Sequence, residues 1–398
     1  MLIGVVALAP GTFHTIIVRQ DGSAWSTGVG QDAKSRNFVQ VISTGAIAAA
    51  AGIYYSIVIM QDNSVWVTAK NVKGEISFFD GSTNSKQMFS YVATIASVKD
   101  VAAGSYHSIV LTHEGHVWSL GWNKYGQLGD WSTNDKTKFR EVRFSGAAAV
   151  AAGDIHSILL KEDGSVWATG GNFKGQLGDG SKTDREHFIR VVSSGMVHVA
   201  ADGYHSILIR EDGSVWATGW NEYGQLGDGS IEDKTEYVRV FPKGAKSVAA
   251  GRRHSMILDL DGSLWVTGYN LYGQLGDGSK INSKVFKHII SGGVQVVAAG
   301  AFHSMILKQD GSIWATGSNE HGQFGDGSRT SEVIFVRLRP FENGASHLNF
   351  CSVSCLRSCY HLVILMHSID SNDGSVTKTT KALGITSTGG QSASDGVN

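Results

Sequence analysis

The chain has 398 residues, of which 42% are hydrophobic, and its 34 basic and 35 acidic side chains give a formal net charge of −1. This even balance offers no general attraction for a phosphate backbone, so we expect no direct nucleic-acid binding. No run of about 18 apolar residues is present, so we expect no membrane span.

The first nine residues are apolar and end in small side chains, as a secretory leader does, but they lack the basic start of one. Val5 to His14 aligns with Val294 to His303 of a regular repeat. We therefore predict that the chain opens on the first strand of a repeat array.

One pattern then recurs along the chain: Ala-Ala-Gly-x-x-His-Ser-Ile, followed by Asp-Gly-Ser-x-Trp-Ala-Thr-Gly and by Gly-Gln-Leu-Gly-Asp-Gly-Ser. A fixed period marks an array of supersecondary units that bury their apolar faces against one another. The histidines that follow one another at a spacing of 49 residues are His107, His156, His205, His254 and His303.

Within the copy around His156, residues 157–160 and 166–169 are short β-prone runs separated by Asp-Gly, a hairpin signal. Residues 188–192 and 197–201 supply two more such runs, and no helical periodicity is present. The units predict an all-β fold, a seven-bladed β-propeller of four-stranded blades with about 49 residues per repeat.

The tryptophan that follows each Asp-Gly-Ser hairpin, or its variants, is interpreted as core that packs one blade against the next. These residues are Trp25, Trp66, Trp118, Trp167, Trp216, Trp265 and Trp314. The repeated histidine is also interpreted as structural, its ring closing a turn by hydrogen bonding to neighbouring backbone. It is present at His14, His107, His156, His205, His254 and His303, with Tyr55 in its place in the second copy.

The aspartate that follows Gly-Gln-Leu-Gly, for example Asp179, is expected to close its loop by accepting bonds from backbone N–H groups two residues on. The loop Gly175 to Thr183 has its lysine one position too late for a phosphate loop and no helix pattern after it. We predict no catalytic residue, no metal ligand and no cofactor.

The repeats are predicted to form a propeller over residues 1–343, with a remodelled loop at residues 69–82. Residues 344–366 are predicted to be a degenerate eighth half-repeat or closing strands, and residues 367–398 a flexible tail rich in Ser, Thr and Gly. Cys351, Cys355 and Cys359 lack the spacing of a zinc site. Free thiols indicate a reducing compartment, so we expect a cytoplasmic protein, with the nucleus as the alternative.

These motifs resemble the regulator of chromosome condensation repeat, over about residues 5–343. The resemblance implies a seven-bladed propeller in a family whose members include a chromatin-bound exchange factor for the small GTPase Ran, a plant ultraviolet-B photoreceptor, accessory domains of ubiquitin ligases and bacterial inhibitors of β-lactamase. The 49-residue spacing through the five histidines leaves no room there for the inserted wedge of the exchange factor. The tryptophans of the photoreceptor motif are also missing, since the corresponding positions are Thr12, Ile53, Ser105, Asp154, Gly203, Arg252 and Ala301.

The two positions before each repeated histidine vary between copies and should form a ring on one face of the disc. Aromatic and arginine side chains there are preferred anchors of protein interfaces, although simple covering of the blade edges explains the aromatic ones equally well. The candidate partner-binding residues are Phe13, Tyr54, Tyr106, Tyr204, Arg252, Arg253 and Phe302. For a second aromatic set, packing is favoured: Trp122, Tyr125, Trp220, Tyr223, Tyr272 and His321.

The function predicted from these residues is a non-enzymatic protein-interaction or regulatory propeller that binds a protein partner through one face. The alternative is a guanine-nucleotide exchange factor, with a small GTPase as the partner.

Overall fold

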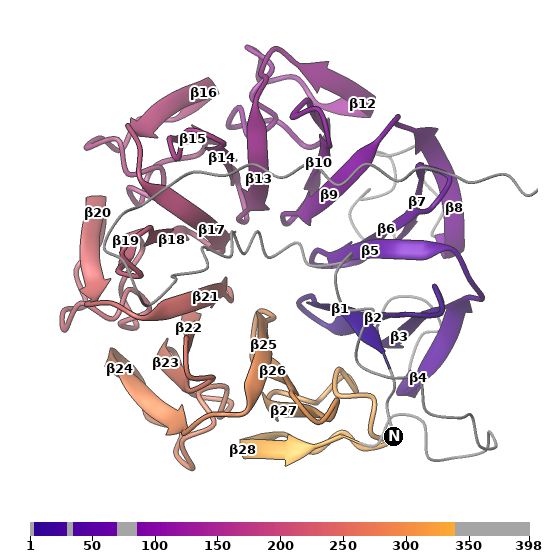
Figure 1. The fold of residues 1–398 in the computed structure, drawn as a ribbon, viewed down its shortest axis with the longest axis vertical. Coiled ribbons are helices and arrows are strands. Elements are labelled where there is room, and N and C mark those ends of the chain that lie inside the picture. Colours follow the sequence, from indigo (N-terminus) through magenta and orange to yellow (C-terminus); the bar gives the residue numbers. More distant parts are fainter. Residues whose placement is uncertain (1–3, 30–34, 70–85, 339–398) are drawn as a thin grey trace, which may run out of the picture. The chain divides into compact units, whose positions relative to one another are not determined.

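The computed structural model describes residues 4–29, 35–69 and 86–338, and within them seven four-stranded antiparallel sheets surround a central axis (Figure 1). Each sheet consists of four strands that are consecutive in the chain and lie in chain order, the first nearest the axis and the fourth at the periphery. The predicted all-β seven-bladed propeller is therefore confirmed. The segments predicted at 344–366 and 367–398 lie outside the described residues, as does all of the predicted loop at 69–82 beyond its first residue.

Blade 1 contains β1 (Val5–Pro10), β2 (His14–Arg19), β3 (Ala24–Gly28) and β4 (Ser35–Ile42), and blade 2 contains β5 (Ala46–Ala51), β6 (Tyr55–Met60), β7 (Ser64–Ala69) and β8 (Lys86–Thr94). Blade 3 contains β9 (Val98–Ala103), β10 (His107–Thr112), β11 (Val117–Gly121) and β12 (Lys136–Val142). Blade 4 contains β13 (Ala147–Ala152), β14 (His156–Lys161), β15 (Val166–Gly170) and β16 (Arg185–Val192), and blade 5 contains β17 (Met196–Asp202), β18 (His205–Arg210), β19 (Val215–Gly219) and β20 (Lys234–Phe241). Blade 6 contains β21 (Ala245–Ala250), β22 (His254–Asp259), β23 (Leu264–Gly268) and β24 (Ser283–Ile290), and blade 7 contains β25 (Val294–Ala299), β26 (His303–Lys308), β27 (Ile313–Gly317) and β28 (Glu332–Arg337).

The boundaries of the blades are shifted from the predicted repeat unit. The run 197–201 lies in β17, the innermost strand of blade 5, and is not the last strand of the blade that contains His156. The predicted antiparallel pairing of 157–160 with 166–169 is confirmed as β14 on β15, and β1 confirms the predicted strand at the start of the chain.

Two faces of the ring follow from the antiparallel order of each sheet. The turns between first and second strands and the loops between third and fourth strands lie at one end, here called the loop face. The Asp-Gly-Ser hairpins between second and third strands lie at the other end, here called the hairpin face. Residues 153–155 and 171–184 illustrate the loop face, and residues 162–165 the hairpin face.

Each hairpin is locked by its own side chains. In blade 4, Asp163 Oδ1 accepts bonds from the backbone N–H and the hydroxyl of Ser165, and Trp167 Nε1 donates to the same hydroxyl. The indole of Trp167 then packs against a buried cluster that combines residues of blade 3, such as Ile109, with residues of blade 4, such as Leu159. Trp25, Trp118, Trp216, Trp265 and Trp314 likewise pack against clusters shared by two blades, so the predicted packing is confirmed for these six tryptophans.

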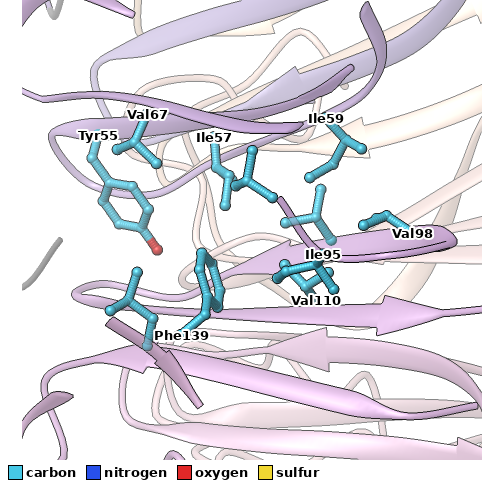
Figure 2. Packing of buried hydrophobic residues seen from close by; sticks show 11 residues of the cluster. Tyr55, Ile57, Ile59, Val67, Ile95, Val98, Val110 and Phe139 are labelled. Atoms are coloured by element: carbon cyan, nitrogen blue, oxygen red, sulfur yellow. The ribbon is translucent and has the colours of Figure 1, made fainter. Parts of the chain in front are cut away.

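The core consists of such interfaces between neighbouring sheets rather than of a single central cluster. Between blades 2 and 3, Ile57 and Ile59 of β6 interdigitate with Val98 and Val110 of β9 and β10 (Figure 2). All four are buried. Because neither sheet buries its apolar face alone, each blade depends on the next.

In blades 3 to 7, the Gly-Gln-Leu-Gly loop, or Gly-Gln-Phe-Gly in blade 7, is bound by polar side chains of the following blade. Thr169 Oγ1 in blade 4 donates to the carbonyl of Gly126, and Ser157 Oγ donates to the carbonyl of Gln127, at 2.9 and 2.7 Å. Gly178 has φ +75°, and a Cβ there would lie 2.4 Å from the ring of Tyr237 in blade 5. The Ser, Thr and Gly of the repeat thus join neighbouring blades, because the hydroxyls bind the loop carbonyls of the previous blade and the glycine leaves room for the aromatic ring of the next.

The expected role of the loop aspartate is confirmed. Asp179 Oδ1 accepts the backbone N–H of Ser181 at 3.0 Å and also binds the amide nitrogen of Asn172. The amide oxygen of Asn172 in turn accepts the N–H of Leu177, so one carboxylate and one amide hold the whole loop.

The repeated histidines lie between blades, and their expected partner was wrong. Each ring contacts a hydroxyl of the next blade through Nε2 instead of closing a turn with neighbouring backbone, because the second strand of the next blade presents a Ser or Thr to it. The contacts are His14 to Ser56, His107 to Ser157, His156 to Ser206, His205 to Ser255, His254 to Ser304 and His303 to Thr15, at 2.7 to 3.2 Å. Burial lowers the pKa of His14 and His205 to about 4 and that of the other four to about 3.

The ring closes between blades 7 and 1 by the same contacts that join other neighbours. Thr15 Oγ1 contacts His303 Nε2 and donates to the carbonyl of Gln323, and Thr27 Oγ1 donates to the carbonyl of Gly322. β1 also packs on β25. Closure therefore uses side chains and loop backbone between two sheets that are each complete in themselves.

Candidate functional site

A belt of aromatic rings covers the loop face. From blade 4 to blade 7, ring contacts with centroid separations of 4.8 to 6.3 Å join seven side chains in sequence: Phe173, Tyr204, Trp220, Tyr223, Tyr269, Tyr272 and Phe302. Two shorter groups continue it, namely His321 with Phe13 and Tyr54, and Tyr106 with Trp122 and Tyr125. Most of these rings are half-buried, so they present edges and faces to solvent while packing on one another.

The structure thus brings together the two aromatic sets that the sequence analysis kept apart. Residues of the turns before the histidines, such as Tyr204, pack directly on residues of the Asn-x-x-Gly loops, such as Trp220 and Tyr223. Ile155, which takes the corresponding turn position in blade 4, is buried. The two sets form one surface, and packing within it does not exclude contact with a partner.

Arg253 stands within this belt. Its guanidinium lies 5.2 to 5.5 Å from the ring centroids of Trp220, Tyr223 and Tyr269. Three aromatic faces around one cation hold it in place by cation–π attraction. The arginine that the sequence marked as an anchor is therefore positioned before any partner arrives.

Arg252, its neighbour, reaches toward blade 4 instead. Its Nε donates to Asp154 Oδ2 at 3.0 Å, which links blade 6 to blade 4 over the intervening blade 5. In blade 5, which lies between them, the residue at the corresponding turn position is Gly203, and a Cβ there would lie 2.2 Å from the carbonyl oxygen of Arg252. Asp154 also accepts a bond from Ser105, and Arg252 keeps 30% of its side chain exposed.

A second carboxyl lies beside this ion pair. Asp202 stands where the other blades have the repeat glycine, and its Oδ1 accepts the N–H of Gly203. Burial, together with the nearby Asp154 carboxylate, raises the pKa of Asp202 to about 8. The Arg252 guanidinium opposes this rise but does not cancel it.

These groups surround the mouth of the axial channel. A cavity of about 210 Å³ is lined there by the ends of the inner strands of all seven blades, largely by alanines such as Ala152 and Ala299. Asp154 and Asp202 are its two carboxyl groups. Small residues line the axis, and they leave room for polar side chains that differ between blades.

Sequence reasoning missed Phe173 and Tyr269 in the belt and did not foresee the pairing of Arg252 with Asp154. A signal for the pair was present in the sequence. Of the seven residues that lie two positions before a repeated histidine or before Tyr55, only Asp154 and Arg252 are charged. A signal for Asp202 was also present, because Ala-Ala-Asp replaces Ala-Ala-Gly in that copy alone.

Within the described ranges, no group of three or more His, Cys, Asp or Glu side chains is arranged to hold a metal ion. In the same ranges, no helix has the length and apolar character to cross a membrane.

Comparison with known families and structures gives consistent matches. The profile of the RCC1-like domain matches residues 2–284, and that of the regulator of chromosome condensation (RCC1) repeat matches residues 294–323. The first of these covers well over half of the chain.

Three solved structures share the fold. Human WBSCR16 is 23% identical, with a TM-score of 0.69 over 76% of this chain and 85% of its own. Prp20p from Saccharomyces cerevisiae, described with its binding to Gsp1p and histones, is 19% identical, with a TM-score of 0.66 over 74% of this chain and 80% of its own. Yeast RCC1 (Prp20) in complex with Kap60 is 18% identical, with a TM-score of 0.71 over 85% of both chains.

Proposed function

The chain belongs to the RCC1-like domain family, and on that premise we propose that it is a non-enzymatic interaction module whose loop face binds a protein partner. The observation that carries the proposal is the aromatic belt with Arg253 fixed at its centre. Tyrosine, tryptophan and arginine dominate the energetics of protein interfaces, and their cost in lost side-chain freedom is small when packing already holds them.

The axial mouth would add specificity to this surface. Asp202 and the exposed part of Arg252 lie inside the belt, so a partner that covers the face brings its own polar groups against them. Buried polar groups that lose water must be matched by the partner, which favours one partner over others.

A deletion of exposed belt contacts tests the proposal. Phe173 and Leu271 are 44% and 54% exposed on loops of the loop face, so the double change Phe173→Ala with Leu271→Ala removes contact area without opening the core. The control is Glu211→Ala, at an exposed position of the hairpin face. Affinity capture with mass spectrometry on the intact chain should recover a partner that the double variant loses and the control keeps. Equal recovery by all three chains would contradict the proposal.

The second candidate is a guanine-nucleotide exchange factor for a small GTPase. It is favoured by the family and by the relative described with its binding to Gsp1p. A release assay with a fluorescent guanine nucleotide on a panel of small GTPases tests it directly. Acceleration that is lost in Arg253→Ala would make exchange the function of the loop face, whereas no acceleration by the intact chain on any GTPase of the panel would count against it.

The proposal places this activity in the cytoplasm, with the nucleus as the alternative. Imaging of a tagged full chain tests the placement, and a secreted or organellar distribution would contradict it.

A further inference from the structure

Trp131 departs from the repeat in its loop. In four other blades the position after the loop aspartate is glycine, at Gly180, Gly229, Gly278 and Gly327, each with φ between +79° and +85°. Trp131 adopts the same left-handed backbone, with φ +66°. A side chain with a Cβ is strained there, and strain of this kind persists where the surroundings or the function require it.

The backbone of the fold does not need this indole. The N–H of Trp131 donates to the carbonyl of Glu186 at 2.9 Å, and the N–H of Gly180 makes the corresponding bond to Thr235 at the same distance. The side chain itself is 63% exposed and stacks on His187 with a centroid separation of 3.7 Å and nearly parallel planes. One face of the indole is thus supported by His187.

The indole forms one wall of a groove between blades 3 and 4. The groove encloses about 600 Å³, and its lining includes Phe144, Trp167 and Phe188, whose rings contact one another through Phe144. Glu141 and the residues after β12 form another wall. None of the belt residues lines the groove, so the groove is separate from the belt.

The charges along the groove are mainly positive. Arg143 is exposed, and the Lys161 ammonium lies 5.1 Å from the centroid of Phe144 and 5.7 Å from that of Trp167. The acid of the lining, Glu141, is paired with His116. A ligand that enters therefore meets an aromatic floor and two cations.

An internal comparison shows what the indole adds. Between blades 5 and 6, Phe241 contacts Trp265 and Phe286 as Phe144 contacts its two neighbours, but the loop position there is Gly229. The same aromatic trio packs without a tryptophan above it. The indole of Trp131 thus exceeds what the interface between blades requires.

We propose that the groove between blades 3 and 4 is a second binding site, which takes an acidic peptide segment of a partner protein that carries an aromatic or aliphatic side chain. The apolar side chain would lie between Trp131 and the Phe144 ring, and the acidic groups would face Arg143 and Lys161. Aromatic anchors in a pocket supply most of the energy of such contacts, and complementary charge supplies orientation.

Panning of a phage-displayed library of random dodecapeptides on the intact chain tests the proposal, with the variant Trp131→Gly as counter-selection. Recovered sequences should combine Asp or Glu with Phe, Trp or Leu. The synthesised peptides should bind the intact chain in fluorescence polarisation and lose at least about tenfold in affinity, about 1.4 kcal/mol, with Trp131→Gly and with Arg143→Glu. Phe173→Ala, on the loop face, should leave their affinity unchanged.

Trp131→Gly is not expected to disturb folding, because four other blades have glycine at the corresponding position. Its Tm should equal or exceed that of the intact chain, because the substitution removes the backbone strain. A clearly lower Tm would mean that the stack on His187 serves the fold, and it would overturn the inference. The inference also fails if no acidic peptide is enriched, if the peptides bind Trp131→Gly equally well, or if a glycan array shows that neutral sugars bind this wall instead.

Discussion

The buried histidines predict a steep loss of stability in mild acid. His254 has a folded-state pKa of about 3, lowered by burial and by the neighbouring His205 and His303, against an ordinary value of 6.5. Between these two values the unfolded chain binds a proton that the folded chain does not. Stability is therefore complete above pH 6.5 and falls as the pH drops toward 3.

The magnitude follows from the two pKa values. At pH 5, protonation of one such histidine in the unfolded state lowers the free energy of unfolding by about 2 kcal/mol. Six histidines of this kind are present in the described residues, and together they approach the whole stability of a typical domain, about 5–15 kcal/mol. We therefore expect acid unfolding to begin near pH 5.

Blade 2 supplies the substitution that tests this. Tyr55 takes the place of the histidine there, with its hydroxyl 3.1 Å from both Ser108 Oγ and the Gly104 carbonyl. His254→Tyr should thus replace a titrating contact by a non-titrating one of a kind that the fold already uses. His254→Gln serves as a second variant in case the larger ring does not fit.

Urea unfolding followed by tryptophan fluorescence at pH 7.5 and pH 5.0 is the assay. The loss of unfolding free energy between the two pH values should be smaller by about 2 kcal/mol in the variants than in the intact chain. His113→Gln, at an exposed position of a hairpin, should leave that loss unchanged. If the variants lose as much stability as the intact chain, the reasoning about buried neutral histidines is refuted.

Three further outcomes are expected. Because the pKa of Asp202 is raised to about 8, the folded chain keeps a proton that the unfolded chain has already released, and stability falls as the pH rises from about 4 to 8. Asp202→Asn cannot ionise, so its stability relative to the intact chain should be clearly higher at pH 8.5 than at pH 5.5. Thermal melts in which that difference is the same at both pH values would contradict this. Gly178→Ala should lower the free energy of unfolding by about 2–4 kcal/mol, because the backbone is strained and the new Cβ meets the ring of Tyr237. Gly229→Ala has open space around its Cβ and should lose about 1 kcal/mol. Equal losses in chemical unfolding would count against the packing of the next blade on this loop. Thr15→Val should lower the free energy of unfolding by about 1–3 kcal/mol, because His303 and the carbonyl of Gln323 lose their hydrogen-bond partner. Hydrogen exchange should then increase in blades 1 and 7 before the other blades. A uniform increase would argue against this closure of the ring.

The fold could be predicted because the repeat makes each local signal recur. The hairpin at residues 161–165 and the packing of Trp167 follow from an Asp-Gly turn and one large aromatic per unit. The phase of the blade could not be assigned, since 197–201 is equally well placed as the last strand of one unit or the first of the next. Only the contacts between sheets decide that.

The histidine partner was mispredicted for a related reason. His156 bonds to Ser206, which is 50 residues away in the chain, and a pattern within one unit does not show which hydroxyl of the next unit faces it. The pair of Asp154 and Arg252 depends on ring geometry, because the two residues belong to blades that are not neighbours. The placement of charge at the axis therefore needed the structure.

Binding of a protein partner by the loop face underlies the proposed function. The most direct test is hydrogen exchange with mass spectrometry on the intact chain, alone and with the partner identified by affinity capture. Binding should slow exchange in the turns 202–204 and 251–253 and in the loops 171–184 and 220–233. Slowed exchange confined to the hairpins 161–165, 210–214 and 259–263 would contradict it.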